Sequence, residues 1–373
     1  MMTKNKVVKA LYIHIPFCER ICDYCDFAKL QYFRIFAVDY LSSLRKEIDS
    51  YHINPDDIKT IYVGGGTPTS LEDDLFLELL KTIEPYSGRV KEYTFEANPE
   101  SLSLTKLKMM KDFGVNRLSV GVESTNDKIL KSINRGHTFQ DVQNAVINAK
   151  KMGFDNLNVD LIIGLPQVSK ALLIKDLDNI LSLNVQHISC YSLTVHPNTV
   201  FFSKGIEEPN GDIAREYYDI VESKLKENGY IHYEISNWSK PGKESLHNYM
   251  YWKDEQYYGI GLGASGYIED IRYTNTRNIQ KYNQGKYVDQ KEAVSLDDDK
   301  TYFIMLNLRT IRGLLFDEYQ ERFGEDFYQK NKEDINELLK ENLIVLDNKL
   351  GRIYPTYDGM MILDQIIMRF IEK

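Results

Sequence analysis

The chain has 373 residues, of which 43% are hydrophobic and 27% charged, and this composition excludes a disordered, collagen-like or coiled-coil protein. Its 46 basic and 55 acidic residues give a formal net charge of -9 without a long basic run, so a nucleic-acid partner gains no support. No apolar run is long enough to span a bilayer and the N-terminus carries no secretion signal, so we expect a cytoplasmic protein without a transmembrane segment.

Short β-rich runs alternate with amphipathic stretches through the first half of the chain. We expect strands at residues 11–15, 60–63, 92–97, 117–122, 157–163 and 187–193. Apolar residues at three- and four-residue spacing predict helices at 38–48, 72–83, 104–113, 139–153 and 170–183. Strands separated by helices pair in parallel, which predicts an α/β fold, either a partial eight-fold barrel or an open doubly wound sheet. In both folds the site lies at the carboxyl ends of the strands.

The pattern changes near residue 200. Residues 201–296 are rich in aromatic residues and glycine, with turn signals at 240–242 and 259–266, and indicate an extension that packs on the barrel. Residues 297–373 combine helical stretches with a hairpin at 343–355 and a last amphipathic helix at 357–371. We therefore predict three parts: a barrel at 1–200, the extension at 201–296, and a winged-helix-like domain at 297–373.

Three of the four cysteines lie on one segment directly after the first expected strand. Cys18, Cys22 and Cys25 have the spacing C-x3-C-x2-C, and clustered cysteines in a cytosolic chain more often mean metal or redox chemistry than disulfides. Three thiolates can hold a cubane iron–sulfur cluster and leave its fourth iron open to a substrate or cofactor. A zinc site completed by His14 or a distant ligand, or reduced structural thiols, are the alternatives. Cys190 stands alone among apolar residues, which indicates a core position.

Small and charged residues follow the next strands. Glycines 64–66 end the second strand, and residues without side chains let the backbone approach a ligand, although such a run is also typical of a plain turn. Glu96 ends the third strand and can accept hydrogen bonds from hydroxyl or ammonium groups, unless it is an exposed charge. Arg135 and Asp160 are also expected near the carboxyl ends of the strands. A carboxylate among apolar neighbours is costly to bury without a donor, which favours a ligand role for Asp160, whereas an arginine such as Arg135 also commonly caps a surface turn.

The segment HIPFCERICDYCDF resembles the signature of radical S-adenosylmethionine (SAM) enzymes. The resemblance extends over nearly the whole chain, to oxygen-independent coproporphyrinogen III oxidase and its relatives, through YIHIPFC, GGGTPT, RLSVGVES, INRGH, DLIIGLP, HISCYSLT, HYEISNW and HNYMYW. It implies a partial (β/α)6 radical SAM barrel with a C-terminal domain, a [4Fe-4S] cluster on the three cysteines, SAM, and an electron donor such as flavodoxin or ferredoxin. Within it, the residues that resemble those at a first SAM are Tyr12, Tyr24, Gly65, Gly66, Thr67 and Glu96. Arg135 and Asp160 resemble residues at a second SAM in the true oxidase.

Three features depart from the oxidase pattern. Phe27 stands where the oxidase has a further cysteine, the oxidase has an N-terminal extension that we do not find, and Glu123 stands where the family usually has glutamine near the second cofactor. The resemblance is therefore stronger to the HemW-type haem chaperones of the family, which implies haem and haem-requiring apo-proteins as partners.

In that group the H-N-x-x-Y-W segment is associated with haem. The resemblance suggests that His247 ligates haem iron while Tyr251 and Trp252 stack on the porphyrin. The ordinary interpretation is that His247 and Asn248 hydrogen-bond a loop and that the aromatic side chains pack.

Three functions compete at this point: a haem-carrying chaperone, a radical enzyme that acts on a porphyrinogen or another tetrapyrrole, and a winged-helix regulator that senses redox state through its cluster. The acidic balance and the lack of a basic recognition helix argue against the regulator. We expect the chaperone, with the oxidase-like enzyme as the alternative.

Overall fold

The computed structural model describes residues 7–371 and is built from strands, helices and short connections. The strands are β1 (Ala10–Ile15), β2 (Phe17–Cys18), β3 (Leu30–Gln31), β4 (Thr60–Gly65), β5 (Glu92–Ala97), β6 (Arg117–Glu123), β7 (Leu157–Ile163), β8 (His187–Ser192), β9 (Ile231–Glu234), β10 (Asn237–Ser239), β11 (Tyr257–Ile260), β12 (Ser265–Ile268), β13 (Ile271–Asn275), β14 (Val288–Ala293), β15 (Leu314–Leu315), β16 (Ile344–Asp347) and β17 (Arg352–Pro355). The α-helices are α1 (Arg34–Ser50), α2 (Asp73–Ser87), α3 (Leu104–Asp112), α4 (Asp127–Ser132), α5 (Phe139–Lys151), α6 (Lys170–Ser182), α7 (Val200–Ser203), α8 (Gly211–Glu227), α9 (Leu246–Trp252), α10 (Ile279–Asn283), α11 (Leu296–Asn307), α12 (Phe316–Phe323), α13 (Phe327–Lys330), α14 (Lys332–Lys340), α15 (Tyr357–Met361) and α16 (Leu363–Ile371). Two 3-10 helices, η1 (Pro68–Ser70) and η2 (Pro99–Ser101), follow β4 and β5.

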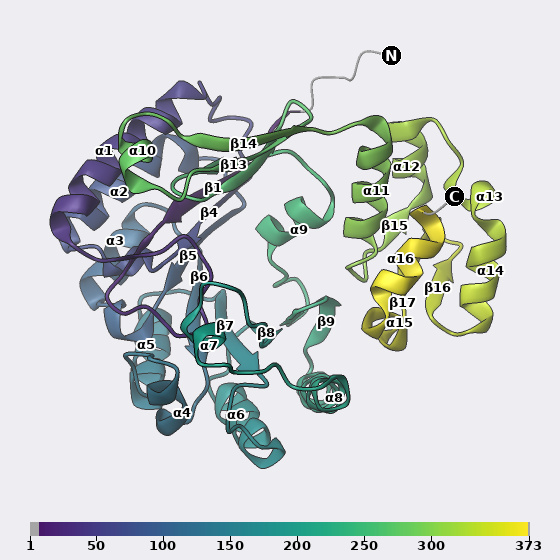
Figure 1. The fold of residues 1–373 in the computed structure, drawn as a ribbon, viewed down its shortest axis with the longest axis horizontal. Coiled ribbons are helices and arrows are strands. Elements are labelled where there is room, and N and C mark those ends of the chain that lie inside the picture. Colours follow the sequence, from purple (N-terminus) through teal and green to yellow (C-terminus); the bar gives the residue numbers. More distant parts are fainter. Residues whose placement is uncertain (1–6, 372–373) are drawn as a thin grey trace.

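The main sheet has 12 strands in the order β14-β13-β12-β11-β1-β4-β5-β6-β7-β8-β10-β9 (Figure 1). Its central strands β1 and β4 to β8 are the six predicted from the sequence, and all five pairings among them are parallel. The predicted α/β fold with a partial barrel is therefore confirmed. Among the described residues no helix is long and apolar enough to cross a membrane.

The two faces of this sheet differ in chemistry. Residues that point outward, such as Leu11, Ile13 and Ile61, are fully buried and belong to the main hydrophobic core with the helices that cover the sheet. The alternate residues point inward, and they include Glu96 and Asp160. Parallel strands are usually apolar on both faces. The polar inner face therefore marks the concave side of the barrel as the place for a site.

The segment after residue 200 lengthens the sheet at both of its edges. Strand β10 pairs antiparallel with β8, and β11 pairs parallel with β1 and carries β12, β13 and β14 beyond it. Helix α8 was not predicted. The side chain of Asn210 caps it by accepting from the backbone NH of Ile213, a start signal that the aromatic character of the segment obscures.

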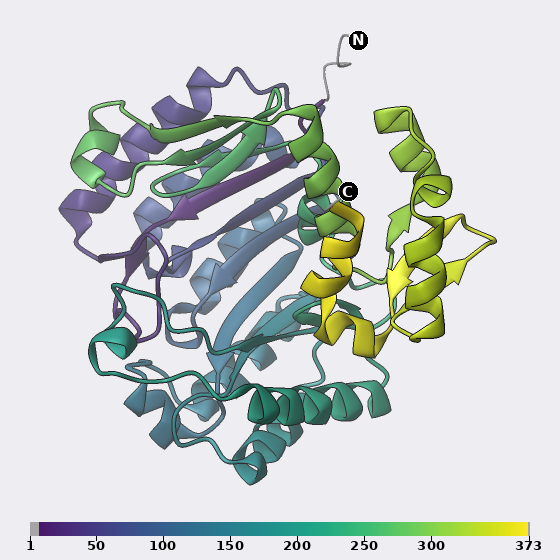
Figure 2. The same ribbon diagram turned by 45° about the vertical axis from the view of Figure 1, so that its right-hand side comes forward.

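A second hydrophobic cluster forms around α11 to α16 and the three-stranded sheet β15-β17-β16 (Figure 2). The hairpin predicted at 343–355 is confirmed as β16 and β17. The helix predicted at 357–371 is interrupted, because Ile362 between α15 and α16 has φ -124 and ψ 29. This unit contacts the barrel through the backbone NH of Ile311, which donates to the carbonyl of Tyr233 at 3.0 Å. The three domain boundaries stay predictions.

Glu47 ties α1 to the added strands and is fully buried. Its carboxylate accepts hydrogen bonds from the backbone NH of Gly261 at 2.9 Å, from Nδ2 of Asn275 at 2.6 Å and from the hydroxyl of Tyr282. Burial raises its pKa, which these three donors oppose.

We expect Glu47→Ala to lower the free energy of unfolding by about 3 kcal/mol, because it leaves buried donors without an acceptor. Urea denaturation followed by circular dichroism measures the change. Glu84→Ala, at an exposed position of α2, is the control and should change stability by less than about 0.5 kcal/mol. Equal midpoints for the two variants would contradict this role of Glu47.

Candidate functional site

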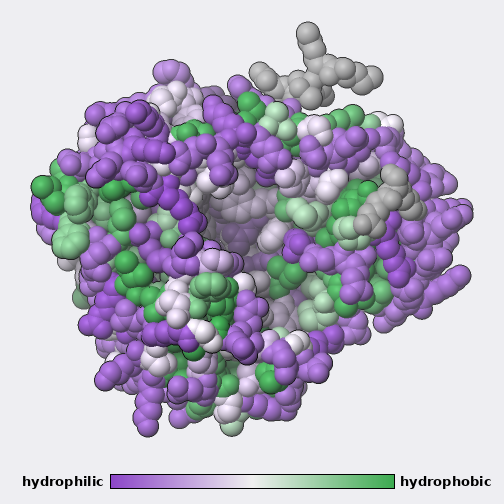
Figure 3. All heavy atoms as spheres, in the orientation of Figure 1, coloured by the Kyte–Doolittle hydropathy of each residue, from purple (hydrophilic) through white to green (hydrophobic). Residues whose placement is uncertain are grey.

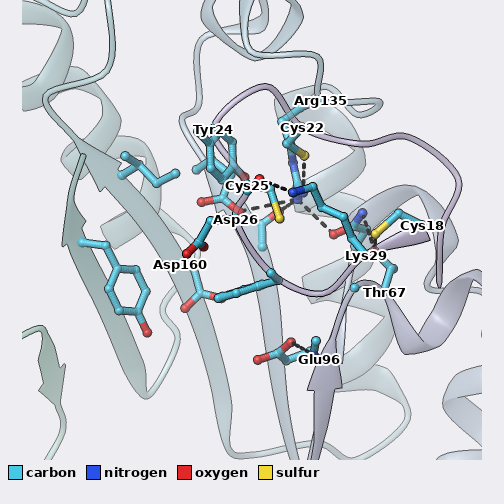
Figure 4. A pocket seen from close by; sticks show the side chains of 18 of the residues that line it. Cys18, Cys22, Tyr24, Cys25, Asp26, Lys29, Thr67, Glu96, Arg135 and Asp160 are labelled. Carbon is cyan, nitrogen blue, oxygen red and sulfur yellow. Dashed lines mark hydrogen bonds and ion pairs between the residues drawn. The ribbon is translucent and has the colours of Figure 1, made fainter. Parts of the chain in front are cut away.

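A cavity of about 340 Å³ lies at the carboxyl ends of the central strands, against the cysteine segment (Figure 4). It brings together most of the site residues predicted from the sequence: Cys18, Cys22, Tyr24, Cys25, Gly65, Gly66, Thr67, Glu96, Glu123, Arg135 and Asp160. The space-filling view shows the molecule hollowed near its centre, beside the C-terminal helices (Figure 3).

Hydrogen bonds fix the path of the cysteine segment at both ends. The backbone NH of Leu30 donates to the carbonyl of Pro16 at 2.7 Å, and the NH of Tyr32 donates to the carbonyl of Cys18 at 2.9 Å. In the middle, Asp23 forms an ion pair with Lys204 at 2.6 Å. The segment is therefore held as a loop over the ends of the strands, with its thiols lining the cavity.

All four cysteines are free thiols. Burial raises the pKa of Cys18 to about 12 and that of Cys25 to about 11. A bound metal ion reverses this effect, because it deprotonates a coordinating thiol. Cys190 is fully buried in the core, as predicted.

Three soft donors on one loop fit an iron–sulfur cluster. Among residues 7–371 no three His, Cys, Asp or Glu side chains converge on the position of a single metal ion. A cubane does not need such convergence, since each thiolate binds a different iron. The zinc alternative also loses its nearest candidate ligand: His14 Nδ1 lies 2.9 Å from the hydroxyl of Tyr12, and Nε2 lies 2.7 Å from the carbonyl of Ala28.

The three glycines at the end of β4, Gly64 to Gly66, leave room that side chains would fill. A Cβ atom at Gly64 would lie 2.6 Å from the carboxylate of Glu96, and one at Gly66 would lie 2.8 Å from the carbonyl oxygen of Phe17 and 3.0 Å from Sγ of Cys18. Gly65 has φ +112, a conformation that favours glycine. The chain therefore presents bare backbone to the cavity beside Cys18.

Four carboxylates line the cavity: Asp26 on the cysteine loop, and Glu96, Glu123 and Asp160 on the sheet. Glu96 accepts from the hydroxyl of Tyr62 at 2.7 Å and from the backbone NH of Gly65 at 2.9 Å. Asp160 accepts from Asn158 Nδ2 at 2.8 Å and from Ser119 Oγ at 3.1 Å. Burial raises the pKa of Asp160, and it raises the pKa values of Glu96 and Glu123 to about 7.

Three cations line the same cavity, Arg20, Lys29 and Arg135, and Arg135 lies beside one of the carboxylates of the sheet. Arg135 Nη2 lies 3.8 Å from Oε1 of Glu123, and Nη1 donates to Sγ of Cys22 at 3.5 Å. Glu123 has φ 64 and sits at a register shift between β6 and β7, which turns its side chain toward the cavity. Asn98 was not among the predicted site residues, yet its Oδ1 accepts from Arg135 at 3.1 Å and its Nδ2 donates to Thr67 at 3.2 Å. The NPES segment after β5 was the available signal.

Four predicted residues lie away from this cavity. Tyr12 does not line it, and its hydroxyl bonds to His14. His247, Tyr251 and Trp252 lie on α9. His247 is fully buried, with Nδ1 2.9 Å from Thr60 Oγ1 and Nε2 2.8 Å from the hydroxyl of Tyr251. Burial lowers its pKa to about 3.

These contacts correspond to the packing interpretation of α9. Ligation of haem iron by His247 stays a prediction, and it requires that one of the two ring nitrogens give up its hydrogen bond.

Comparisons with known proteins agree with this architecture. Residues 12–180 match the radical SAM superfamily, and residues 294–362 match the HemN C-terminal domain. Coproporphyrinogen III oxidase (HemN) from Escherichia coli has the same fold, with a TM-score of 0.82 and 22% identity over 98% of this chain and 90% of that chain. The fold and the cysteine loop thus define a radical SAM protein.

The curated relatives give the particular family. Heme chaperone HemW of Lactococcus lactis is 36% identical over 96% of this chain and 96% of its own length. The Bacillus subtilis protein of that name is also 36% identical, over 98% and 99%. The Escherichia coli protein is 34% identical over 82% and 83%. The chain belongs to the HemW family, which implies a [4Fe-4S] cluster and SAM as cofactors of the radical SAM domain.

We predict that Cys22→Ala loses most of the iron and sulfide of the anaerobically reconstituted protein, because two thiolates cannot hold the cluster as three do. Cys190→Ala removes a buried thiol outside the cavity and should keep both elements at the wild-type level. Iron and acid-labile sulfide analysis measures this difference. Full cluster content in Cys22→Ala, or its loss in Cys190→Ala, would refute the assignment.

Proposed function

We propose that the protein binds haem and delivers it to haem-requiring proteins, with the cluster and SAM in a supporting role. The observation that carries this proposal is the similarity to heme chaperones over nearly the full length of both chains. The recipients would be haem-requiring apo-proteins of the cytoplasm, and an electron donor such as flavodoxin or ferredoxin would reduce the cluster.

The cavity suits SAM in charge and in shape. When bound by Cys18, Cys22 and Cys25, the cluster supplies an open iron for the amino and carboxylate groups of SAM and the electron that reduces its sulfonium. The side chains supply opposite charge for the sulfonium, since four carboxylates line the cavity, Asp26, Glu96, Glu123 and Asp160, beside the three cations Arg20, Lys29 and Arg135. Gly65, Gly66 and Thr67 supply backbone that a ligand can approach, while Tyr24 covers the cavity wall.

Glu96 gives this site an expected pH dependence. Because burial raises its pKa to about 7, a cationic ligand must bind the deprotonated form and its affinity falls as the pH falls below 7. We expect the dissociation constant of SAM to rise about tenfold between pH 8 and pH 6.

Isothermal titration calorimetry of the anaerobic protein measures this dependence. In Glu96→Gln the affinity should be lower at pH 8 and its slope with pH shallower, with Glu123 left to titrate. A slope equal to that of the wild type would show that Glu96 does not control binding.

The alternative function is oxidation of coproporphyrinogen or another tetrapyrrole by an oxidase-like radical enzyme. Two residues at the cavity argue against this oxidase activity. Phe27 lines the cavity at the position where the oxidase pattern has a cysteine, and its side chain is 56% exposed. Glu123 places a carboxylate where a neutral amide is usual, which changes the hydrogen bonding and charge around a second SAM.

Two assays in parallel distinguish these functions. We expect the reconstituted protein to bind haem, seen as a change in the Soret band, and to release little 5′-deoxyadenosine with coproporphyrinogen III. Formation of protoporphyrinogen at about one turnover per second or faster would reverse this conclusion in favour of the oxidase.

A further inference from the structure

Helix α9 lies between the main sheet and the C-terminal unit, by which we mean residues 296–371 (Figure 1). One side of α9 meets the sheet, where the ring of His247 packs on that of Tyr62 at 5.3 Å between centroids. The other side meets α11, the first helix of the C-terminal unit. This unit has a hydrophobic cluster of its own, so it can move as one body relative to α9.

The two ends of α9 are fixed to different parts of the protein. At its start, Glu92 on β5 accepts hydrogen bonds from the first two backbone NH groups of α9, both at 2.9 Å. Just after its end, the buried carboxylate of Asp254 accepts from Nη2 of Arg272 on β13 and from Nη2 of Arg322 on α12, both at 2.6 Å. The barrel thus holds the start of α9, whereas its end is shared between the added strands and the C-terminal unit.

Arg322 is the cation through which the C-terminal unit holds α9. Its Nε also donates to Oδ2 of Asp299 on α11 at 3.0 Å, so one guanidinium joins α11 and α12 to Asp254. Among the ion pairs within residues 7–371, only one other crosses to the C-terminal unit: Arg215 on α8 with Asp358 on α15, whose side chains are 41% and 64% exposed. An exposed pair contributes little to stability, whereas a buried charge that loses its partner is strongly destabilised. The Asp254–Arg322 pair is therefore the stronger of the two links.

This arrangement keeps the HNYMYW segment of α9 closed. His247 is fully buried between α9 and the sheet, and its Nε2 lies 2.8 Å from the hydroxyl of Tyr251. Nε1 of Trp252, at the end of α9, is buried and has no hydrogen-bond partner among the described residues. A buried donor without a partner is unfavourable, so the closed arrangement does not satisfy every polar group of the segment. For a porphyrin to reach His247, α9 must move away from the sheet, and the C-terminal unit blocks that movement.

We propose that the C-terminal unit is a lid over α9, with the Asp254–Arg322 ion pair as its latch, and that haem reaches His247 when this lid opens. Release of Arg322 leaves the start of α9 on Glu92 and its end on Arg272, so the helix can shift while the barrel stays folded. The proposal rests on the proposed function, and it gives the C-terminal unit a role in haem loading.

The test is rapid mixing of the anaerobically reconstituted protein with haemin, followed in the Soret band. We expect Arg322→Gln to raise the association rate constant about tenfold, because a larger fraction of the molecules has an open lid. Arg322→Lys keeps a cation that can pair with Asp254, so its increase should be smaller. Asp358→Ala is the matched control, since it breaks the exposed ion pair of the same unit with α8, and it should leave the rate constant unchanged.

Hydrogen–deuterium exchange observes the lid without haem. In Arg322→Gln the backbone amides of α9 should exchange about tenfold faster than in the wild type, while those of β5 and β6 keep the wild-type rate, which shows that the barrel is folded. If the wild type binds no haem at all, the proposed function fails and haem loading fails with it. If the wild type binds haem and Arg322→Gln associates with it at the same rate, the lid alone is refuted.

Discussion

Burial of polar side chains on the inner face of a parallel sheet is the constraint on which the structure depends. A buried polar group costs free energy unless it is hydrogen-bonded, so the inward-facing polar side chains need partners. Near the amino ends of the strands several have them, although Thr94 Oγ1 and Arg117 Nε do not. His187 Nδ1 lies 2.6 Å from Asn158 Oδ1, and its Nε2 lies 2.8 Å from the hydroxyl of Tyr233. Glu92 accepts from the backbone NH groups of Leu246 and His247, both at 2.9 Å, which anchors α9 at that end.

The carboxyl ends of the strands are different, because their carboxylates have few close cations. Arg135 lies 3.8 Å from Glu123, Arg117 acts on Asp160, and burial raises the pKa values of Glu96, Glu123 and Asp160. A buried carboxylate without a close cation is stabilised when a cation binds beside it or when it takes up a proton. The amino ends of the strands thus carry polar side chains that bond to one another and to α9. The carboxyl ends carry carboxylates that can bind a cationic ligand beside the cysteine loop.

The sequence predicted the residues at the cavity better than the hydrogen bonds at the opposite end of the strands. The six central strands are β-rich runs bounded by turns, and the rim residues follow them directly, so their meeting at one edge follows from parallel pairing. The partners of His247 could not be predicted in this way, because Thr60 Oγ1 lies 187 residues earlier in the chain. The motif HNYMYW therefore suggests a haem ligand from the sequence, whereas in the structure its histidine, His247, is buried and hydrogen-bonded.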